Sequence, residues 1–178
     1  QCVNLKNHNV MTSLNIIILA AGKGTRMHSN TPKVLHEVGG KPILAHVIDC
    51  AKALNPQKII VVYGYGGEIV REAFSQENIT WVNQAEQNGT GHAVQQAAPF
   101  LDVNALSLVM LGDVPLVDVA ACKALIEQAN NKLAILSFNK ADPSGYGRIV
   151  RTDKQNVTAI VEHKDATEAQ RNIVEVNT

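Results

Sequence analysis

One stretch decides how the chain folds: Ile16-Ile17-Ile18-Leu19-Ala20-Ala21-Gly22-Lys23-Gly24-Thr25-Arg26. Its opening apolar run is typical of a buried strand, and the two alanines let the chain leave that strand close to a ligand. The loop that follows carries glycines and cations, and glycine lets backbone N–H groups approach an anion closely. The stretch therefore predicts a phosphate-binding loop at the end of a central strand. A plain basic turn remains the alternative.

Two familiar nucleotide loops do not fit this stretch. The string G-x-x-x-x-G-K-[ST] of a P-loop does not occur in the sequence. The dinucleotide fingerprint G-x-G-x-x-G begins with Gly22 and Gly24 but ends on Met27. An NAD-dependent dehydrogenase is therefore disfavoured, and only measurable NAD binding would restore it.

The composition narrows the class of protein. The chain has 178 residues, of which 46% are hydrophobic and 18% charged, as in an ordinary globular domain. Lys+Arg and Asp+Glu both number 16, so the basic excess of a nucleic-acid binder is missing. The cysteines show no metal-type spacing, which predicts a cytoplasmic location. Neither a signal peptide nor an apolar run of about 20 residues is present, so we expect no membrane partner.

The order of segments predicts an α/β fold. Residues 1–10 are polar without periodicity and are interpreted as a leader, whereas residues 11–178 are expected to form one domain. Alternating apolar runs and amphipathic segments predict a doubly wound, mostly parallel sheet. The expected strands are 15–19, 59–63, 79–82, 106–111 and 133–138; the expected helices are 42–54, 68–74, 92–98 and 117–129; a hairpin pairs 148–151 with 157–161.

Three loops are expected to meet at one site, because ligands of open α/β sheets lie outside the carboxyl ends of the strands. These loops are residues 20–26, 84–90 and 111–113. Asp113 ends an apolar strand and is interpreted as a magnesium ligand, with a helix N-cap or a turn aspartate as the alternatives. Gln84 has an amide that can donate and accept, so it can read the edge of a base. His92 is interpreted as structural rather than as a catalytic base, because nothing pairs it with an acid.

Several motifs, in order, resemble those of the sugar-1-phosphate nucleotidyltransferases. They are LAAGKGTRM at 19–27, Pro32-Lys33, QAEQNGTGHA at 84–93, GDVPL at 112–116, GYGRI at 145–149 and IVEHKD at 160–165. The best match is to the N-terminal uridyltransferase half of the bacterial bifunctional N-acetylglucosamine-1-phosphate uridyltransferase/glucosamine-1-phosphate acetyltransferases. Close relatives often have tyrosine where this chain has Leu111. This chain also carries one extra residue in the turn at 152–156.

The resemblance implies a Rossmann-like nucleotidyltransferase fold and a reaction. UTP and N-acetylglucosamine-1-phosphate would give UDP-N-acetylglucosamine and pyrophosphate, with Mg²⁺ as cofactor, for synthesis of the bacterial envelope. The family continues beyond residue 178 into the rest of this domain, with a second metal ligand, and a β-helix that builds a homotrimer. The sequence is therefore interpreted as a truncated piece of little activity. A non-catalytic nucleotide-sugar-binding module and an enzyme for another sugar-1-phosphate remain alternatives.

The resemblance also implies roles for single residues. Arg26 and Lys33 would be catalytic, with Arg26 at the triphosphate and Lys33 at the α-phosphate, and Asp113 would hold Mg²⁺. Ala21, Gln84, Gly89 and Thr90 would hold uracil, and Gly147, Glu162 and Asn177 would hydrogen-bond the N-acetylglucosamine. The remaining expected nucleotide or substrate contacts are Leu19, Ala20, Gly22, Leu111 and Gly112.

Overall fold

The computed structural model describes residues 13–22, 29, 31–64, 66–129, 132–153 and 156–177. The predictions made for Lys23, Gly24 and Arg26 lie outside these residues. The chain divides into two compact units, Gln1–Ala124 and Leu125–Thr178. None of the helices in the described ranges is long and apolar enough to span a membrane.

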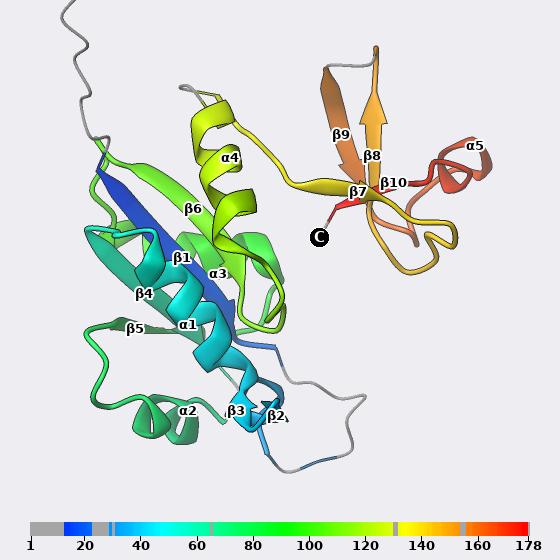
Figure 1. Cartoon of the computed structure of the whole chain (residues 1–178). Helices are drawn as coiled ribbons and strands as arrows, with labels where there is room; N and C mark the ends of the chain where they lie inside the picture. The colour runs from blue at the N-terminus through cyan, green and yellow to red at the C-terminus, as the bar shows by residue number, and fades with distance from the viewer. Residues whose placement is uncertain are drawn as a thin grey trace, which may run out of the picture. The chain divides into compact units, whose positions relative to one another are not determined.

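The first unit contains a four-stranded parallel sheet in the order β5-β4-β1-β6 (Figure 1). Its strands are β1 (Leu14–Ala20), β4 (Lys58–Tyr63), β5 (Thr80–Asn83) and β6 (Leu106–Leu111). β1 pairs with β4 on one side and with β6 on the other, so it is the central strand that the opening stretch predicts. Its side chains at 16–18 are at most 1% exposed.

Helices cover both faces of this sheet, which confirms the doubly wound α/β fold. In Figure 1 α1 (Ile43–Ala53) lies in front of the strands and α3 (Thr90–Ala97) behind them. The other helical segments are the 3₁₀ turns Lys33–Leu35 and Ala98–Phe100, α2 (Gly67–Ala73) and α4 (Val119–Ala129). A short hairpin of β2 (Glu37–Val38) and β3 (Lys41–Pro42) turns at Gly39 and Gly40, which both have positive φ.

The chain itself explains where α1 begins and ends. Pro42 precedes the first turn, and the N–H of Ile43 donates to the carbonyl oxygen of His36 at 2.8 Å, which satisfies one of the free donors of the helix start. Leu44, Val47, Ile48 and Ala51 form its buried stripe. Asn55 adopts φ +50° just beyond the helix, and Pro56 prevents its continuation.

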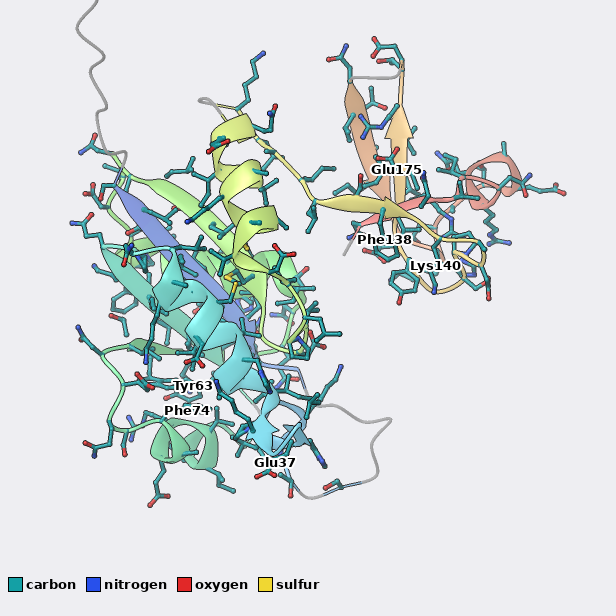
Figure 2. All side chains as sticks on the ribbon, viewed as in Figure 1. Glu37, Tyr63, Phe74, Phe138, Lys140 and Glu175 are labelled. Atoms are coloured by element: carbon teal, nitrogen blue, oxygen red, sulfur yellow. The ribbon has the colours of Figure 1, made fainter. Side chains whose placement is uncertain are left out.

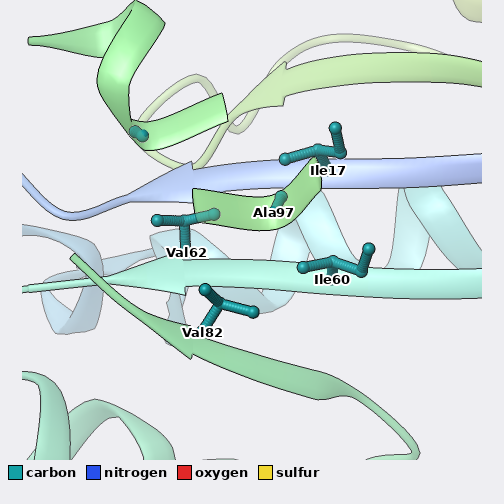
Figure 3. Packing of buried hydrophobic residues seen from close by; sticks show 6 residues of the cluster. Ile17, Ile60, Val62, Val82 and Ala97 are labelled. Atoms are coloured by element: carbon teal, nitrogen blue, oxygen red, sulfur yellow. The ribbon is translucent and has the colours of Figure 1, made fainter. Parts of the chain in front are cut away.

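The side of the sheet that faces α3 holds a tight apolar cluster (Figure 3). Ile17, Ile60 and Val62 come from β1 and β4, and Val82 comes from β5. The helix contributes only the small residues Ala93 and Ala97, so its backbone can approach the strands closely. This packing fixes the start of α3 against the carboxyl ends of the strands.

The exposure of β6 differs from the prediction of a buried strand. Leu108 and Met110 are buried, whereas Ser107 and Val109 are exposed. β6 is an edge strand within the described part of the chain, and α3 packs on β1, β4 and β5. One face of β6 therefore remains open, and its exposure alternates as expected for a strand covered on a single face.

The second unit contains an antiparallel sheet in the order β7-β10-β8-β9. The predicted hairpin is confirmed as β8 (Arg148–Arg151) and β9 (Val157–Val161). The strand predicted at 133–138 is corrected to β7 (Ser137–Asn139), which lies in this sheet rather than in the parallel one. Leu133 is 93% exposed, because an apolar segment becomes a strand only where an edge pairs with it. The sequence analysis also missed α5 (Glu168–Arg171) and β10 (Glu175–Asn177).

Candidate functional site

A cavity of about 400 Å³ opens at the carboxyl end of the parallel sheet. This volume lies within the range of small-molecule sites, and the place is where open α/β sheets bind ligands. Its walls come from the end of β1, the 3₁₀ turn after Pro32, the loop from β5 to α3 and the end of β6. The lining residues are Leu19, Ala20, Ala21, Gly22, Lys33, Val34, Gln84, Gln87, Gly89, Thr90, Ala93, Leu111 and Asp113.

Close approach of backbones shapes the wall beside β1. The N–H of Gly112 donates to the carbonyl oxygen of Leu19 at 2.9 Å, and a Cβ at Gly112 would lie 2.9 Å from that oxygen. A Cβ at Gly64 would lie 3.0 Å from the carbonyl oxygen of Ala21. Glycine at both positions lets the neighbouring strand ends stay close to β1.

The charged groups of the cavity form one ion pair. The Nζ of Lys33 lies 2.6 Å from Oδ2 of Asp113, although 80 residues separate them in the sequence. Both side chains are 38% exposed, so each can be reached from the cavity. The resemblance implies separate roles for the two residues, with Lys33 at a phosphate and Asp113 at a metal. The structure adds that they neutralise each other.

The described part of the chain offers a divalent cation few protein ligands. No group of three or more His, Cys, Asp or Glu side chains gathers there in a metal-binding arrangement. Mg²⁺ characteristically keeps waters and takes one or two carboxylates together with substrate phosphates. The single carboxylate of Asp113 at the cavity wall fits that pattern, provided that most of the remaining ligands come from a nucleotide and from water.

Gln84 is the polar residue that lies deepest in the site, with 3% of its surface exposed. Its backbone N–H donates to the carbonyl oxygen of Tyr63 at 2.7 Å, which ties the end of β5 to the end of β4. Its Nε2 donates to the carbonyl oxygen of Gly89 at 3.1 Å and lies 3.0 Å from Nδ1 of His92. The other ring nitrogen of His92 faces Gln96, so both ring nitrogens of this histidine lie against amide side chains among the described residues.

The three residues that the resemblance links to the sugar gather in the second unit. Gly147 precedes β8, Glu162 follows β9 and Asn177 ends β10, and the antiparallel register brings these positions to one end of the sheet. The N–H of Asn177 donates to the carbonyl oxygen of Gly147 at 3.2 Å. A Cβ at Gly147 would lie 2.6 Å from Oδ1 of Asn177, so any larger residue there would displace the Asn177 side chain.

Arg148 sits beneath this end of the sheet and is 1% exposed. Its guanidinium donates to the carbonyl oxygens of Tyr146 and Arg171 and faces Nδ1 of His163. None of the salt bridges among the described residues includes it. Arg148 therefore ties the turn before β8 to the segment around α5. Figure 2 labels Phe138 and Lys140 of the same unit. The Phe138 ring packs edge-on against Tyr146, and Lys140 Nζ lies 5.3 Å from the centre of the Tyr146 ring.

The two cysteines in the described part of the chain lie outside the cavity lining. Cys50 and Cys122 are free, and their thiols are hydrogen-bonded to each other although the sequence separates them widely. Burial raises the pKa of the Cys122 thiol to about 12 and also raises that of Cys50. Thiolates of these two cysteines are therefore scarce at neutral pH.

Most of the expected nucleotide contacts lie together in the first unit. All the expected nucleotide contacts between Leu19 and Asp113 that the structure describes line the cavity, with one exception. The exception is Gly112, which lies between the lining residues Leu111 and Asp113. The sequence analysis missed Val34, Gln87 and Ala93, which also line it. Val34 follows Lys33 and Gln87 lies in the loop between Gln84 and Gly89, whereas Ala93 lies in the first turn of α3, where its N–H donates to the carbonyl oxygen of Gly89. Closeness to an expected contact is the one signal in the sequence that could have indicated these residues.

The fold places the chain among Rossmann-like α/β proteins that bind ligands at this edge of the sheet. The sequence profile of the MobA-like NTP transferase domain matches residues 16–171. The chain belongs to this family.

Curated relatives confirm the branch indicated by the motifs. The chain is 59% identical to the bifunctional protein GlmU of Methylobacillus flagellatus over 167 residues, 94% of this chain. It is 54% identical to GlmU of Dechloromonas aromatica over 165 residues, 93% of this chain. It spans only 36% of the length of each of these relatives.

Solved structures agree with the fold. A putative glucose-1-phosphate thymidylyltransferase from Bacillus anthracis superimposes with a TM-score of 0.72 at 21% identity, covering 93% of this chain and 69% of that one. HddC from Yersinia pseudotuberculosis, complexed with GMP-PN, gives a TM-score of 0.68 at 25% identity, covering 83% and 68%.

Proposed function

We propose that the protein transfers a uridylyl group from UTP to N-acetylglucosamine-1-phosphate, giving UDP-N-acetylglucosamine and pyrophosphate for envelope synthesis. The observation that carries the proposal is the convergence of Lys33, Gln84 and Asp113 on one cavity from three distant parts of the chain. The identity to GlmU proteins supports the choice of substrates.

The cavity suits a nucleoside triphosphate in one orientation. Gln84 and Gly89 lie at one part of its wall and offer amide and backbone groups to a base, with Ala21 and Thr90 beside them. Lys33 and Asp113 provide the charged part, where phosphates and their cation would bind. Arg26, outside the described residues, is proposed to face the triphosphate and the developing pyrophosphate charge.

The reaction needs positioning and charge compensation rather than a covalent intermediate. A phosphate oxygen of the sugar-1-phosphate attacks the α-phosphorus of UTP in line, and pyrophosphate leaves. Lys33 Nζ would move from Asp113 to an α-phosphate oxygen and offset the charge that develops there. Mg²⁺, held by Asp113 and the phosphates, would neutralise the triphosphate.

The sugar is proposed to bind to the group formed by Gly147, Glu162 and Asn177. The Asn177 amide and the Glu162 carboxylate can both hydrogen-bond hydroxyl and acetamido groups. By the same resemblance, the whole protein is proposed to work in the cytoplasm and to form a homotrimer through a C-terminal domain.

The test measures UTP binding by equilibrium dialysis and pyrophosphate release with Mg²⁺ and N-acetylglucosamine-1-phosphate. Asp113→Asn should lower the rate by about 10²-fold or more, as for the loss of one charge-stabilising group. Asp49→Asn, which changes an exposed aspartate of α1 outside the cavity, is the matched control and should leave both quantities unchanged. UTP binding without turnover would favour a nucleotide-sugar-binding module instead, and no UTP binding would contradict both functions.

A further inference from the structure

The orientation of the Gln84 amide is fixed by chemistry. Its Nε2 lies 3.1 Å from the carbonyl oxygen of Gly89, which can only accept a hydrogen bond. The reverse orientation would place two acceptor oxygens against each other at the same distance. The nitrogen of the amide must therefore face Gly89.

His92 completes this arrangement from the first turns of α3. Its Nδ1 lies 3.0 Å from the same Nε2, which has a second hydrogen to donate. Nδ1 must therefore be an unprotonated acceptor, and the ring proton resides on Nε2. Nε2 of His92 lies 3.1 Å from the terminal amide of the half-buried Gln96. Exchanging the oxygen and nitrogen of that amide lets its oxygen accept the hydrogen of His92 Nε2.

This leaves the Gln84 oxygen as the group that faces a ligand. Oε1 makes no hydrogen bond to the described residues. It is also not one of the buried atoms without a partner, so it remains accessible. Gln84 lines the cavity, so Oε1 is reached from there. With both amide hydrogens engaged, the side chain offers the cavity an acceptor and no donor.

We infer that His92 is a positioning residue for base selection, which locks Gln84 with its oxygen toward the cavity and so favours a base that presents a ring N–H. Uracil carries a hydrogen on N3 and can donate it to the Gln84 oxygen. N3 of cytosine is an acceptor, so it would face the Gln84 oxygen without forming a hydrogen bond. A buried pair of polar groups that cannot hydrogen-bond costs about 1–3 kcal/mol, which corresponds to a preference of roughly 5-fold to 150-fold. The inference rests on the proposed function, because it takes Gln84 to contact the base.

The test compares dissociation constants for UTP and CTP in the presence of Mg²⁺. His92→Phe removes one of the two acceptors that hold the Gln84 nitrogen. Gly89 alone then opposes turning of the amide, so the substitution should reduce the preference for UTP over CTP by about tenfold. His92→Asn places an oxygen near the position of Nδ1 and should retain most of the preference. Gln96→Ala, which leaves Nδ1 untouched, should retain it as well.

A merely structural role of His92 gives a different pattern. His92→Phe would then weaken UTP and CTP equally, and an unchanged ratio would overturn the inference. The ¹⁵N shifts of the His92 ring in the wild-type chain test it without any substitution: a proton on Nε2 is expected, and a proton on Nδ1 overturns it. If Gln84→Ala left UTP binding unchanged, the proposed placement of the base would itself fail.

Discussion

Lys33 and Asp113 form an ion pair, with Nζ of Lys33 2.6 Å from Oδ2 of Asp113. The proposed mode of nucleotide binding requires this pair to separate. A triphosphate gives Lys33 a second partner of stronger charge, and a divalent cation does the same for Asp113. Both side chains are 38% exposed, so releasing the pair costs little, as for other accessible ion pairs. The pair can therefore hold both groups in place without blocking the site.

Lys33→Met should weaken UTP binding about tenfold or more, because it removes a charge-assisted hydrogen bond to phosphate. Equilibrium dialysis with Mg²⁺ measures the change. Lys52→Met is the matched control, since Lys52 pairs with Glu77 away from the cavity. Equal affinities of wild type and Lys33→Met would remove Lys33 from the phosphate site.

Glu175 makes the stability of the chain depend on pH. Hydrogen bonds from Arg151, and then from Ser137, lower the pKa of its carboxyl from 4.5 to about 2. A lowered folded-state pKa stabilises the fold above the unfolded value of 4.5, and this contribution is lost as the pH falls toward 2. The pair is partly accessible, so we expect about 1 kcal/mol.

Urea unfolding followed by circular dichroism checks this expectation at pH 7 and pH 3. Glu175→Gln should lower the free energy of unfolding at pH 7 and narrow the difference between the two pH values. Glu127→Gln, an exposed carboxylate, serves for comparison. An equal loss between pH 7 and pH 3 in wild type and Glu175→Gln would rule out this source of acid sensitivity.

Helix α2 shows how closely the elements pack at the open edge of β5. A Cβ at Gly67 would lie 1.9 Å from Cδ2 of Tyr63, so the helix start touches the Tyr63 ring directly. That ring packs against Trp81 with centroids 6.1 Å apart, and Phe74 stacks on Trp81 at 6.4 Å. Figure 2 labels Tyr63 and Phe74 beside α2.

Gly67→Ala should therefore lower the free energy of unfolding by about 1–3 kcal/mol, the usual cost of overpacking. It should also alter the fluorescence of Trp81, the single tryptophan. Gly91→Ala is the matched control, because a Cβ there meets nothing within 4 Å inside α3. It should stabilise by up to about 1 kcal/mol. A Gly67→Ala protein as stable as wild type would contradict the described packing.

The sequence predicted the parallel sheet well because its signals are local. The apolar run at 16–19 is continuous, and the expected strand at 59–63 differs from β4 by one residue. β7 and β10 have three residues each and depend on pairing with each other, so the local pattern at 133–138 misplaced β7 and no local pattern indicated β10. Two features of the site also form only in the folded chain and leave no local pattern in the sequence. They are the contact between Lys33 and Asp113 and the orientation of the Gln84 amide.

The chain as a whole combines a nucleotide-type cavity in one compact unit with a separate antiparallel sheet in the other. We propose that residues 11–178 carry the nucleotidyltransferase domain, and that residues 1–10 contribute nothing to it. The support is compositional, since the first ten residues are polar and lack periodicity.

Removal of residues 1–10 should leave the free energy of unfolding within about 0.5 kcal/mol of the original value, as for changes that touch no packed feature. It should also leave the dissociation constant for UTP unchanged. Urea unfolding and equilibrium dialysis measure the two quantities. A clear loss in either would make these residues part of the domain.

A crystal structure of the chain grown with UTP and Mn²⁺, with the metal located by its anomalous scattering, tests the proposed site most directly. We expect the base against Gln84 and Gly89, the metal on Asp113, and Lys33 moved onto a phosphate. A nucleotide bound outside this cavity, or a metal elsewhere with the Lys33–Asp113 pair intact, would contradict the account.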